Sequence, residues 1–231
     1  MWSISEVKAI GKKAFKANYW PSVIVAVLMG IFLGGTTASS NWRMQNKPEE
    51  VSITMSGLDS KETVAAVLVF IGIIGTVLAV ALLIKIFIGN PITLGGYNFF
   101  KQNIEDTPAP LSILGTGFQN YGHNFVTLLL RDLYVFLWTL LLIVPGIIKA
   151  YSYSMVPFIL AENPDMPANE VLNRSREMMD GNKMQAFLMD LSFIGWILFG
   201  IVTLGLGLIF WTSPYLYSSH AALYLKLKGR R

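Results

Sequence analysis

Three charged side chains lie inside long apolar stretches of this 231-residue sequence. Arg131 and Asp132 lie about eight residues into one stretch, and Asp190 lies at a similar depth in a later one. An unpaired charge in lipid costs about 2.5–3.5 kcal/mol on insertion scales. Asp190 follows Arg131 by the period of an internal repeat, so we hypothesise that these two charges pair. The alternative is that the Arg131 side chain extends to the lipid headgroups.

Two further polar groups lie in the last apolar stretches. One includes Lys149, Tyr151 and Tyr153, and the other surrounds Pro214 and includes Tyr215, Tyr217 and His220. Hydroxyl-bearing residues at this density commonly join helices to one another. The alternative is a polar cavity between the two stretches. The candidate intramembrane polar site comprises Arg131, Asp132, Lys149, Tyr151, Tyr153, Asp190, Tyr215 and His220.

Catalytic and metal-binding motifs are scarce. The sequence has no cysteine and two histidines, His123 and His220, whose separation does not suggest a zinc motif. It contains no phosphate-binding loop, no HExxH motif and no nucleophile elbow. The lysines flank apolar runs, so nucleic acid is not expected as a partner. We therefore expect no enzyme activity, no metal and no cofactor, and an intramembrane enzyme is the least favoured class.

The composition predicts an integral membrane protein. Hydrophobic residues make up 53% of the chain and charged residues only 14%, and the mean hydropathy is +0.52. A soluble surface needs roughly a quarter of its residues charged. Most of this protein's surface must therefore face lipid.

An internal repeat sets the expected organisation. Asp165, Pro167 and Gly181 repeat Asp106, Pro108 and Gly122 without a gap. A looser third copy opens the chain. We therefore predict one membrane domain built from three units, 1–89, 104–162 and 163–231, with an outer loop at 36–63.

Each unit is expected to contain an amphipathic surface helix followed by two membrane spans. The fold class is thus an all-α integral membrane protein with six transmembrane helices in three hairpins, each preceded by an amphipathic helix on the cytoplasmic side. Asn90-Pro91 should end the helix of the second span, and Gly122 and Gly181 should end the second and third surface helices. The expected spans are 20–35, 64–89, 124–144, 147–162, 184–204 and 206–227.

The N-terminal helix is expected to lie at the membrane surface. Ser3 and Glu6 have capping-box spacing, and Lys8, Lys12 and Lys16 share one face. Trp20 is expected to anchor the chain at the membrane interface, where tryptophan is enriched. The alternatives are a solvated helix, and a signal peptide in place of an uncleaved first span.

The distribution of basic residues predicts the orientation. Outside the 36–63 loop they gather in the N-terminal helix, near Lys183 and in the C-terminal tail. The positive-inside rule therefore places both termini in the cytoplasm and the loop outside. Lys149 is the exception, because this topology puts it near the outer face.

Several motifs carry a resemblance to a known family. They are the Pro145-Gly146 turn, Glu162-Asn163-Pro164, the helix end Ser175-Arg-Glu-Met-Met-Asp-Gly181, and Trp211-x-x-Pro214-Tyr215. With the opening SEVKAIGKKAFKANYW, they make the chain resemble the bacterial membrane proteins grouped as domain of unknown function 975. The resemblance implies a multipass protein of the bacterial cytoplasmic membrane and assigns no catalytic residue.

The favoured function is handling of an amphipathic or lipid-like molecule, as a small transporter or a transporter accessory. Intramembrane charges, kinked spans and interfacial helices favour it. The alternative is a non-transporting membrane interaction protein, such as a sensor, an immunity factor or a complex subunit. The expected partners are the lipid bilayer, a lipid or amphipathic ligand, and a membrane protein.

Overall fold

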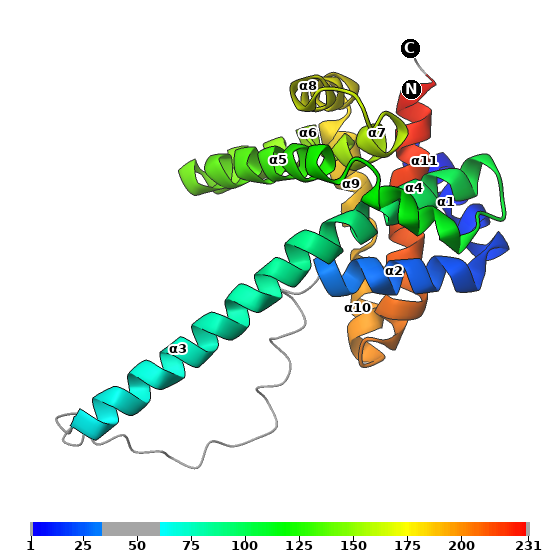
Figure 1. Ribbon diagram of the computed structural model, residues 1–231. Coiled ribbons are helices and arrows are strands. Elements are labelled where there is room, and N and C mark those ends of the chain that lie inside the picture. Colours follow the sequence, from blue (N-terminus) through cyan, green and yellow to red (C-terminus); the bar gives the residue numbers. More distant parts are fainter. Residues whose placement is uncertain (1, 34–60, 230–231) are drawn as a thin grey trace.

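The computed structural model describes residues 2–33 and 61–229, and within these ranges the regular structure is entirely helical. The prediction of an all-α protein is confirmed for this part of the chain. Most of the predicted 36–63 loop lies outside the described residues. Figure 1 shows a body of packed helices from which α3 extends.

The N-terminal helix α1 (Ile4–Ala17) begins where the capping-box spacing predicts. The Ser3 side chain accepts a hydrogen bond from the Glu6 backbone N–H. The apolar face of α1 packs on α11 (Ser213–Lys228), and Val7 and Phe15 are fully buried. This face of the amphipathic helix is therefore covered by protein.

Gly11 allows α1 and α11 to approach closely. A Cβ atom at this position would lie 2.7 Å from the backbone nitrogen of Ser219. Because a backbone atom cannot move aside as a side chain can, only glycine fits this contact.

The next helices depart from the predicted pattern at Pro91. α2 (Tyr19–Leu33) follows α1 at an angle of 107°. α3 (Lys61–Ile84) continues through a π-helix, Lys85–Gly89, into α4 (Asn90–Glu105). The predicted break at Asn90-Pro91 is therefore wrong. Proline lacks the N–H that an α-helix interior requires, but Pro91 directly follows a π-helical turn, where the regular α-helical hydrogen bonding is already interrupted.

The fourth helix forms part of the core. Leu94, Phe99 and Phe100 of α4 are at most 2% exposed, and α4 packs against α2, α7 and α11. The adjacent Gly95 and Gly96 permit close helix packing, which buries the aromatic rings that follow.

The predicted surface helix at 108–121 is a 3₁₀-helix, Leu111–Phe118, packed on α4. Asn120 has the left-handed conformation, with φ of 49°, and separates it from α5 (Tyr121–Leu141). Gly122 therefore lies in the first turn of α5 and does not end the preceding helix. Asparagine is one of the few residues other than glycine that adopt this conformation readily.

The segment after α5 contains two short helices. Leu142 is extended and α6 (Ile143–Ser152) begins at once, so Pro145-Gly146 lies within α6 and does not form the predicted reversal. Residues 153–155 then interrupt the helix before α7 (Val156–Glu162). Proline in the first turn of α6 removes no intrahelical hydrogen bond.

The third surface helix, α8 (Ala168–Met178), follows the prediction more closely. Val171 and Met178 are buried, and α8 packs on α5 and α7. Gly181 has φ of 69° and follows α8, as predicted. Asp165 does not cap this helix: its carboxylate accepts a hydrogen bond of 2.6 Å from the Asn120 side-chain amide.

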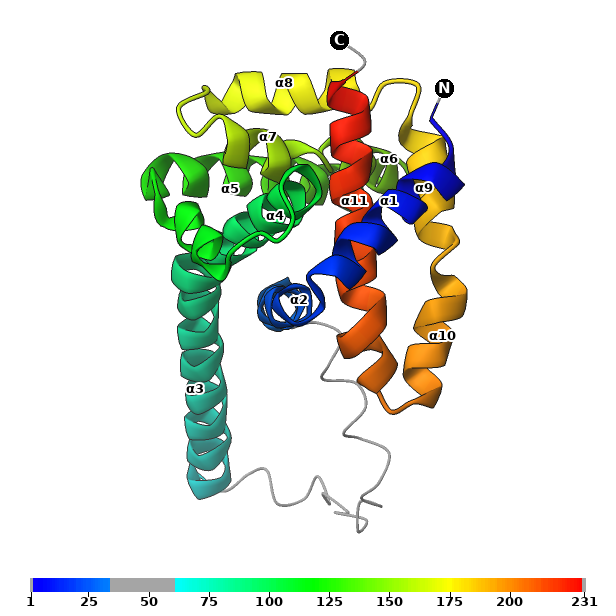
Figure 2. The same cartoon turned by 90° about the vertical axis from the view of Figure 1, so that its right-hand side faces the viewer.

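The final segment comprises α9 (Lys183–Leu191), α10 (Ile194–Val202), a π-helix at Leu208–Thr212, and α11. The chain reverses at Leu204 and Gly205, which have φ of 54° and 89°. Figure 2 shows α10 and α11 side by side, with the start of α1 and the end of α11 at the same end of the molecule.

Three helical segments among the described residues are long and apolar enough to cross a membrane: Tyr121–Leu141, Ile143–Glu162 and Lys183–Val202. Counting the bent pair α1 and α2 as one span makes four. The structure therefore supports a membrane protein with about three or four spans, whereas six were expected. In Figure 1, α5 leaves the body in a different direction from α10 and α11.

Candidate functional site

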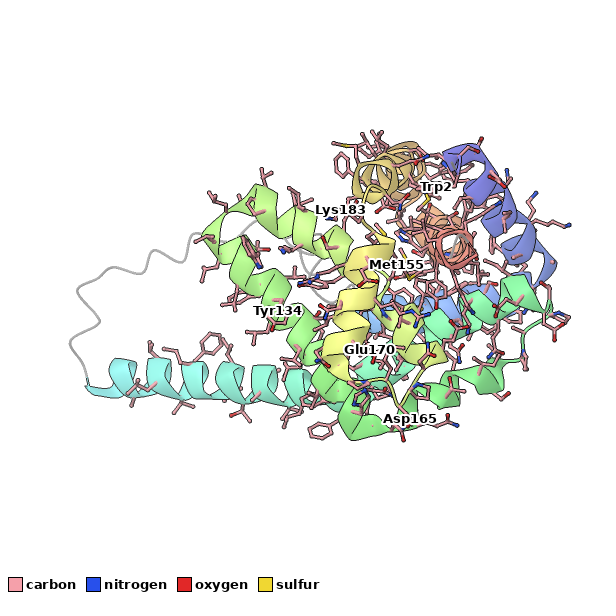
Figure 3. The ribbon with its side chains drawn as sticks, turned by 90° about the horizontal axis from the view of Figure 1, so that it is seen from above. Trp2, Tyr134, Met155, Asp165, Glu170 and Lys183 are labelled. Carbon is pink, nitrogen blue, oxygen red and sulfur yellow. The ribbon has the colours of Figure 1, made fainter. Side chains whose placement is uncertain are left out.

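A cavity of about 490 Å³ lies where α4, α5, α11 and the interruption between α6 and α7 meet. Figure 3 labels Tyr134 on α5 and Met155 at that interruption. Both segments contribute residues to the cavity lining. The polar residues that line it are Tyr97, Arg131, Asp132, Tyr153, Ser154, Tyr217 and His220. The other lining residues are Val135, Phe136, Ala150, Pro157 and Leu216. The cavity therefore has both a polar and an apolar wall.

Arg131 pairs with its neighbour in sequence. Its Nε and Nη2 atoms donate to Asp132 Oδ1 at 2.9 and 2.7 Å. The hypothesis that Arg131 pairs with Asp190 is therefore wrong. The repeat places the two residues at equivalent positions, but Asp190 is engaged by side chains from α6 and α11.

Asp190 joins three helices beside the cavity. Tyr151 on α6 donates its hydroxyl to Asp190 Oδ2 at 2.8 Å. His220 Nε2 on α11 lies 2.8 Å from Asp190 Oδ1. His220 lines the cavity, whereas Asp190 does not. The Asp190 carboxylate thus contacts two side chains of the protein.

Three tyrosines surround the polar wall. The rings of Tyr97 and Tyr217 meet edge to face with centroids 6.2 Å apart, and Tyr153 stacks on Tyr134 at the same distance. Among the described residues, none of the hydroxyls of Tyr97, Tyr153 and Tyr217 has a hydrogen-bond partner. Tyr97 is not among the site residues predicted from the sequence, although the Gly95-Gly96 pair before it indicates close helix packing.

Four predicted site residues lie outside the cavity lining: Lys149, Tyr151, Asp190 and Tyr215. The Lys149 ammonium lies 4.8 Å from the centre of the Trp138 ring. Tyr215 is 5% exposed and packs edge to face on Phe193. The structure thus brings Arg131, Asp132, Tyr153 and His220 to one cavity, with Tyr151 and Asp190 behind them.

The predicted membrane-surface residues have mixed surroundings. Lys8 donates to Ser192 Oγ at 2.9 Å and lies over the Phe193 ring, and Lys16 lies over Trp211. Lys12 is partly exposed. Trp20 is 65% exposed, which suits an anchor at the membrane interface.

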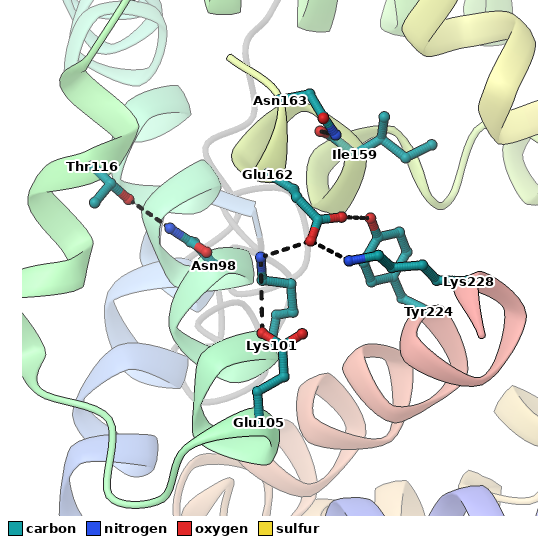
Figure 4. Close-up of polar contacts among 9 residues, drawn as sticks. All are labelled: Asn98, Lys101, Glu105, Thr116, Ile159, Glu162, Asn163, Tyr224 and Lys228. Carbon is teal, nitrogen blue, oxygen red and sulfur yellow. Dashed lines mark hydrogen bonds and ion pairs between the residues drawn. The ribbon is translucent and has the colours of Figure 1, made fainter.

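A second polar cluster, shown in Figure 4, ties α4, α7 and α11 together. Glu162 accepts hydrogen bonds from the Tyr224 hydroxyl at 2.6 Å and from Lys228 Nζ at 2.5 Å. Lys101 Nζ lies 3.6 Å from Glu162 and 4.0 Å from Glu105, and its side chain is only 7% exposed. Nothing in the sequence around Lys101 indicates a buried ion pair.

The described residues contain no group of three or more histidine, aspartate or glutamate side chains that could hold a metal ion. The cavity nevertheless combines a guanidinium group, an imidazole and phenol hydroxyls with apolar side chains. This arrangement can bind a molecule that has a polar head and an apolar body.

The model of the family described as Protein of unknown function (DUF975) matches residues 3–231. The chain belongs to this family. The match covers nearly the whole sequence, so it includes every helix that forms the cavity. Neither the curated proteins nor the solved structures contain a match.

Proposed function

We propose that this DUF975 protein binds an amphipathic or lipid-like molecule in the cavity between α4, α5, α7 and α11, as a small transporter or a transporter accessory. One observation carries the proposal: Arg131, His220 and three tyrosines line the same cavity as Val135, Phe136 and Leu216. An arginine within a long apolar helix is expensive in lipid, and such residues commonly mark substrate sites.

The position of the cavity supports an amphipathic ligand. Phe136 lines the cavity and is 61% exposed, and its neighbours Leu133 and Leu137 on α5 are also about half exposed. In a membrane these side chains face acyl chains. A lipid-like molecule can therefore reach the cavity from the bilayer.

The proposal is tested by purifying the full chain in mild detergent and identifying bound lipids by native mass spectrometry. We expect an amphipathic molecule bound to the parent protein. A bulky residue in the cavity, introduced as Ala150→Phe, should abolish this binding. The control Ala79→Phe, on the exposed side of α3, should bind as the parent does. Equal lipid content in both variants would contradict the proposal.

The second candidate function is a non-transporting interaction protein, and α3 favours it. Every described side chain of α3 is exposed, and the helix extends away from the body in Figure 1. Lipid or a second membrane protein could cover these apolar side chains. A membrane protein that co-purifies in fixed stoichiometry, and is lost when α3 is replaced by a polyleucine helix, would favour this function.

We also propose the six-span arrangement with both termini in the cytoplasm of a bacterial cell. The proximity of the start of α1 to the end of α11 supports termini on one side. The basic residues of both segments favour the cytoplasmic side.

A further inference from the structure

We propose that the polar wall of the cavity binds an oxyanion, a phosphate or carboxylate group, that forms the head of the amphipathic ligand. This inference rests on the proposed function and specifies the ligand's chemistry. The cavity lining holds one permanent cation, Arg131, together with tyrosine hydroxyls that can donate hydrogen bonds.

The first step is the state of Arg131. Both of its hydrogen bonds to Asp132 end on the same oxygen, Oδ1. The third guanidinium nitrogen, Nη1, donates no hydrogen bond to any described residue. A guanidinium group has five N–H donors in a fork that matches phosphate and carboxylate oxygens. Arg131 therefore has unused N–H donors for a ligand bound in the cavity.

The pairing of Arg131 with Asp132 does not prevent such binding. The Asp132 side chain is 60% exposed, whereas that of Arg131 is 23% exposed. Because Arg131 uses only Nε and Nη2 in this pair, an oxyanion can accept from Nη1 and share the guanidinium group with Asp132.

The second step is the set of neutral donors. The hydroxyls of Tyr97, Tyr153 and Tyr217 have no hydrogen-bond partner among the described residues. Tyr97 lines the same cavity as Arg131. A ligand oxyanion can accept from all of these groups and is attracted by the guanidinium charge, which repels a cationic head.

The third step concerns the negative charge of Asp190. Its two oxygens lie 2.8 Å from Tyr151 and from His220. Asp190 is not a lining residue, so its oxygens do not offer acceptors to the cavity. Asp132 Oδ2 is then the one carboxylate oxygen of the lining without a partner among the described residues.

The inference is tested with matched lipids that differ only in the phosphate group. Dioleoyl phosphatidate, dioleoylglycerol and inorganic phosphate are titrated into the detergent-purified full chain, and binding is followed by native mass spectrometry and by the thermal unfolding midpoint. We expect phosphatidate to bind and raise the midpoint, dioleoylglycerol to bind at least tenfold more weakly, and inorganic phosphate to bind more weakly still.

Variants of the donors complete the test. Arg131→Gln should weaken phosphatidate binding about tenfold, the effect expected for a charged hydrogen bond. Arg176→Gln, which removes an exposed arginine on α8, is the matched control and should bind as the parent does. Tyr217→Phe keeps the ring and removes one hydroxyl, so it tests the site even if Arg131→Gln fails to fold.

The outcomes separate this inference from the function on which it rests. Equal affinity for dioleoylglycerol and phosphatidate would overturn the oxyanion inference and leave amphiphile binding intact. Binding of inorganic phosphate as tightly as phosphatidate would support the oxyanion and overturn the lipid-like ligand. Unchanged phosphatidate binding in both Arg131→Gln and Tyr217→Phe would place the lipid elsewhere and overturn the inference.

Discussion

At the scale of single residues, partner choice decides the polar site. Arg131 and Asp132 are neighbours in the chain, whereas Asp190 meets Tyr151 and His220 only because three helices converge. The costs of a charge in lipid correctly indicated that these residues would be paired. Their repeat positions suggested the wrong partner, because equivalent positions in two repeats need not face one another.

We expect Asp190→Asn to destabilise the protein. The amide keeps the shape of the side chain but removes the charge that both Tyr151 and His220 contact. Loss of a hydrogen bond to a charged group costs about 1.5–3 kcal/mol. The thermal unfolding midpoint in detergent measures the effect. The charge swap Arg131→Asp with Asp190→Arg should not restore stability, and restoration would show that the two residues pair after all.

Glu162→Gln should be the more damaging change in the second polar cluster. Glu162 is contacted by Tyr224, Lys228 and the buried Lys101. Without its charge, Lys101 keeps only Glu105 at 4.0 Å, so we expect a loss of about 1.5–3 kcal/mol.

Glu105→Gln is the matched control for that change, because the Glu105 side chain is 41% exposed and touches the cluster only through Lys101. Its effect on urea or thermal unfolding should be below about 1 kcal/mol. An equal loss in both variants would mean that Glu162 does not hold the three helices together.

At the scale of helices, close packing replaces the lipid contact expected for the surface helices. The apolar faces of α1 and α8 both lie against other helices of the same chain. Amphipathic periodicity identifies an apolar face but does not say whether lipid or protein covers it. The contact of α1 with α11 can be tested directly at Gly11.

Gly11→Ala should destabilise the protein by about 1–3 kcal/mol, the usual cost of overpacking. The added methyl group would lie 2.7 Å from the Ser219 backbone nitrogen and would force α1 away from α11. Gly30→Ala in α2 is the control, since nothing lies within 4 Å of its Cβ position. It should be neutral or slightly stabilising, because alanine favours a helix more than glycine does. A Gly11→Ala protein as stable as the parent would mean that α1 does not dock on α11.

At the scale of the whole molecule, the two ends of the chain and the start of α9 are tied together. The Trp2 indole donates to Asn182 Oδ1 at 3.0 Å, and Gln185 donates to the Trp2 carbonyl at 2.6 Å. An ion pair of 2.5 Å joins Glu6 of α1 to Lys226 of α11. These contacts require the segments around residues 2–6, 182–185 and 226 to lie on the same side of any membrane.

This arrangement predicts the labelling pattern of single cysteines in a chain that has none of its own. Cysteines introduced as Ser5→Cys and Lys183→Cys should react with an impermeant maleimide only after lysis. Ser56→Cys, in the proposed outer loop, should react in intact cells. Labelling of Ser5→Cys and Lys183→Cys on opposite sides would contradict the contacts of Trp2. Labelling of all three from one side would contradict the proposed outer loop.

The sequence by itself determined the helical class, the presence of helices apolar enough to cross a membrane, the start of α1 and the left-handed residue after α8. Apolar runs, the Ser3 capping box and the left-handed glycine at position 181 are local signals, and each acts within a few residues of itself. Tertiary structure alone decided that α4 enters the core, that Lys101 is buried with Glu162, and that Tyr97 joins Arg131 and His220 at a cavity. These contacts join residues from separate helices, and hydrophobic periodicity carries no information about which helices become neighbours.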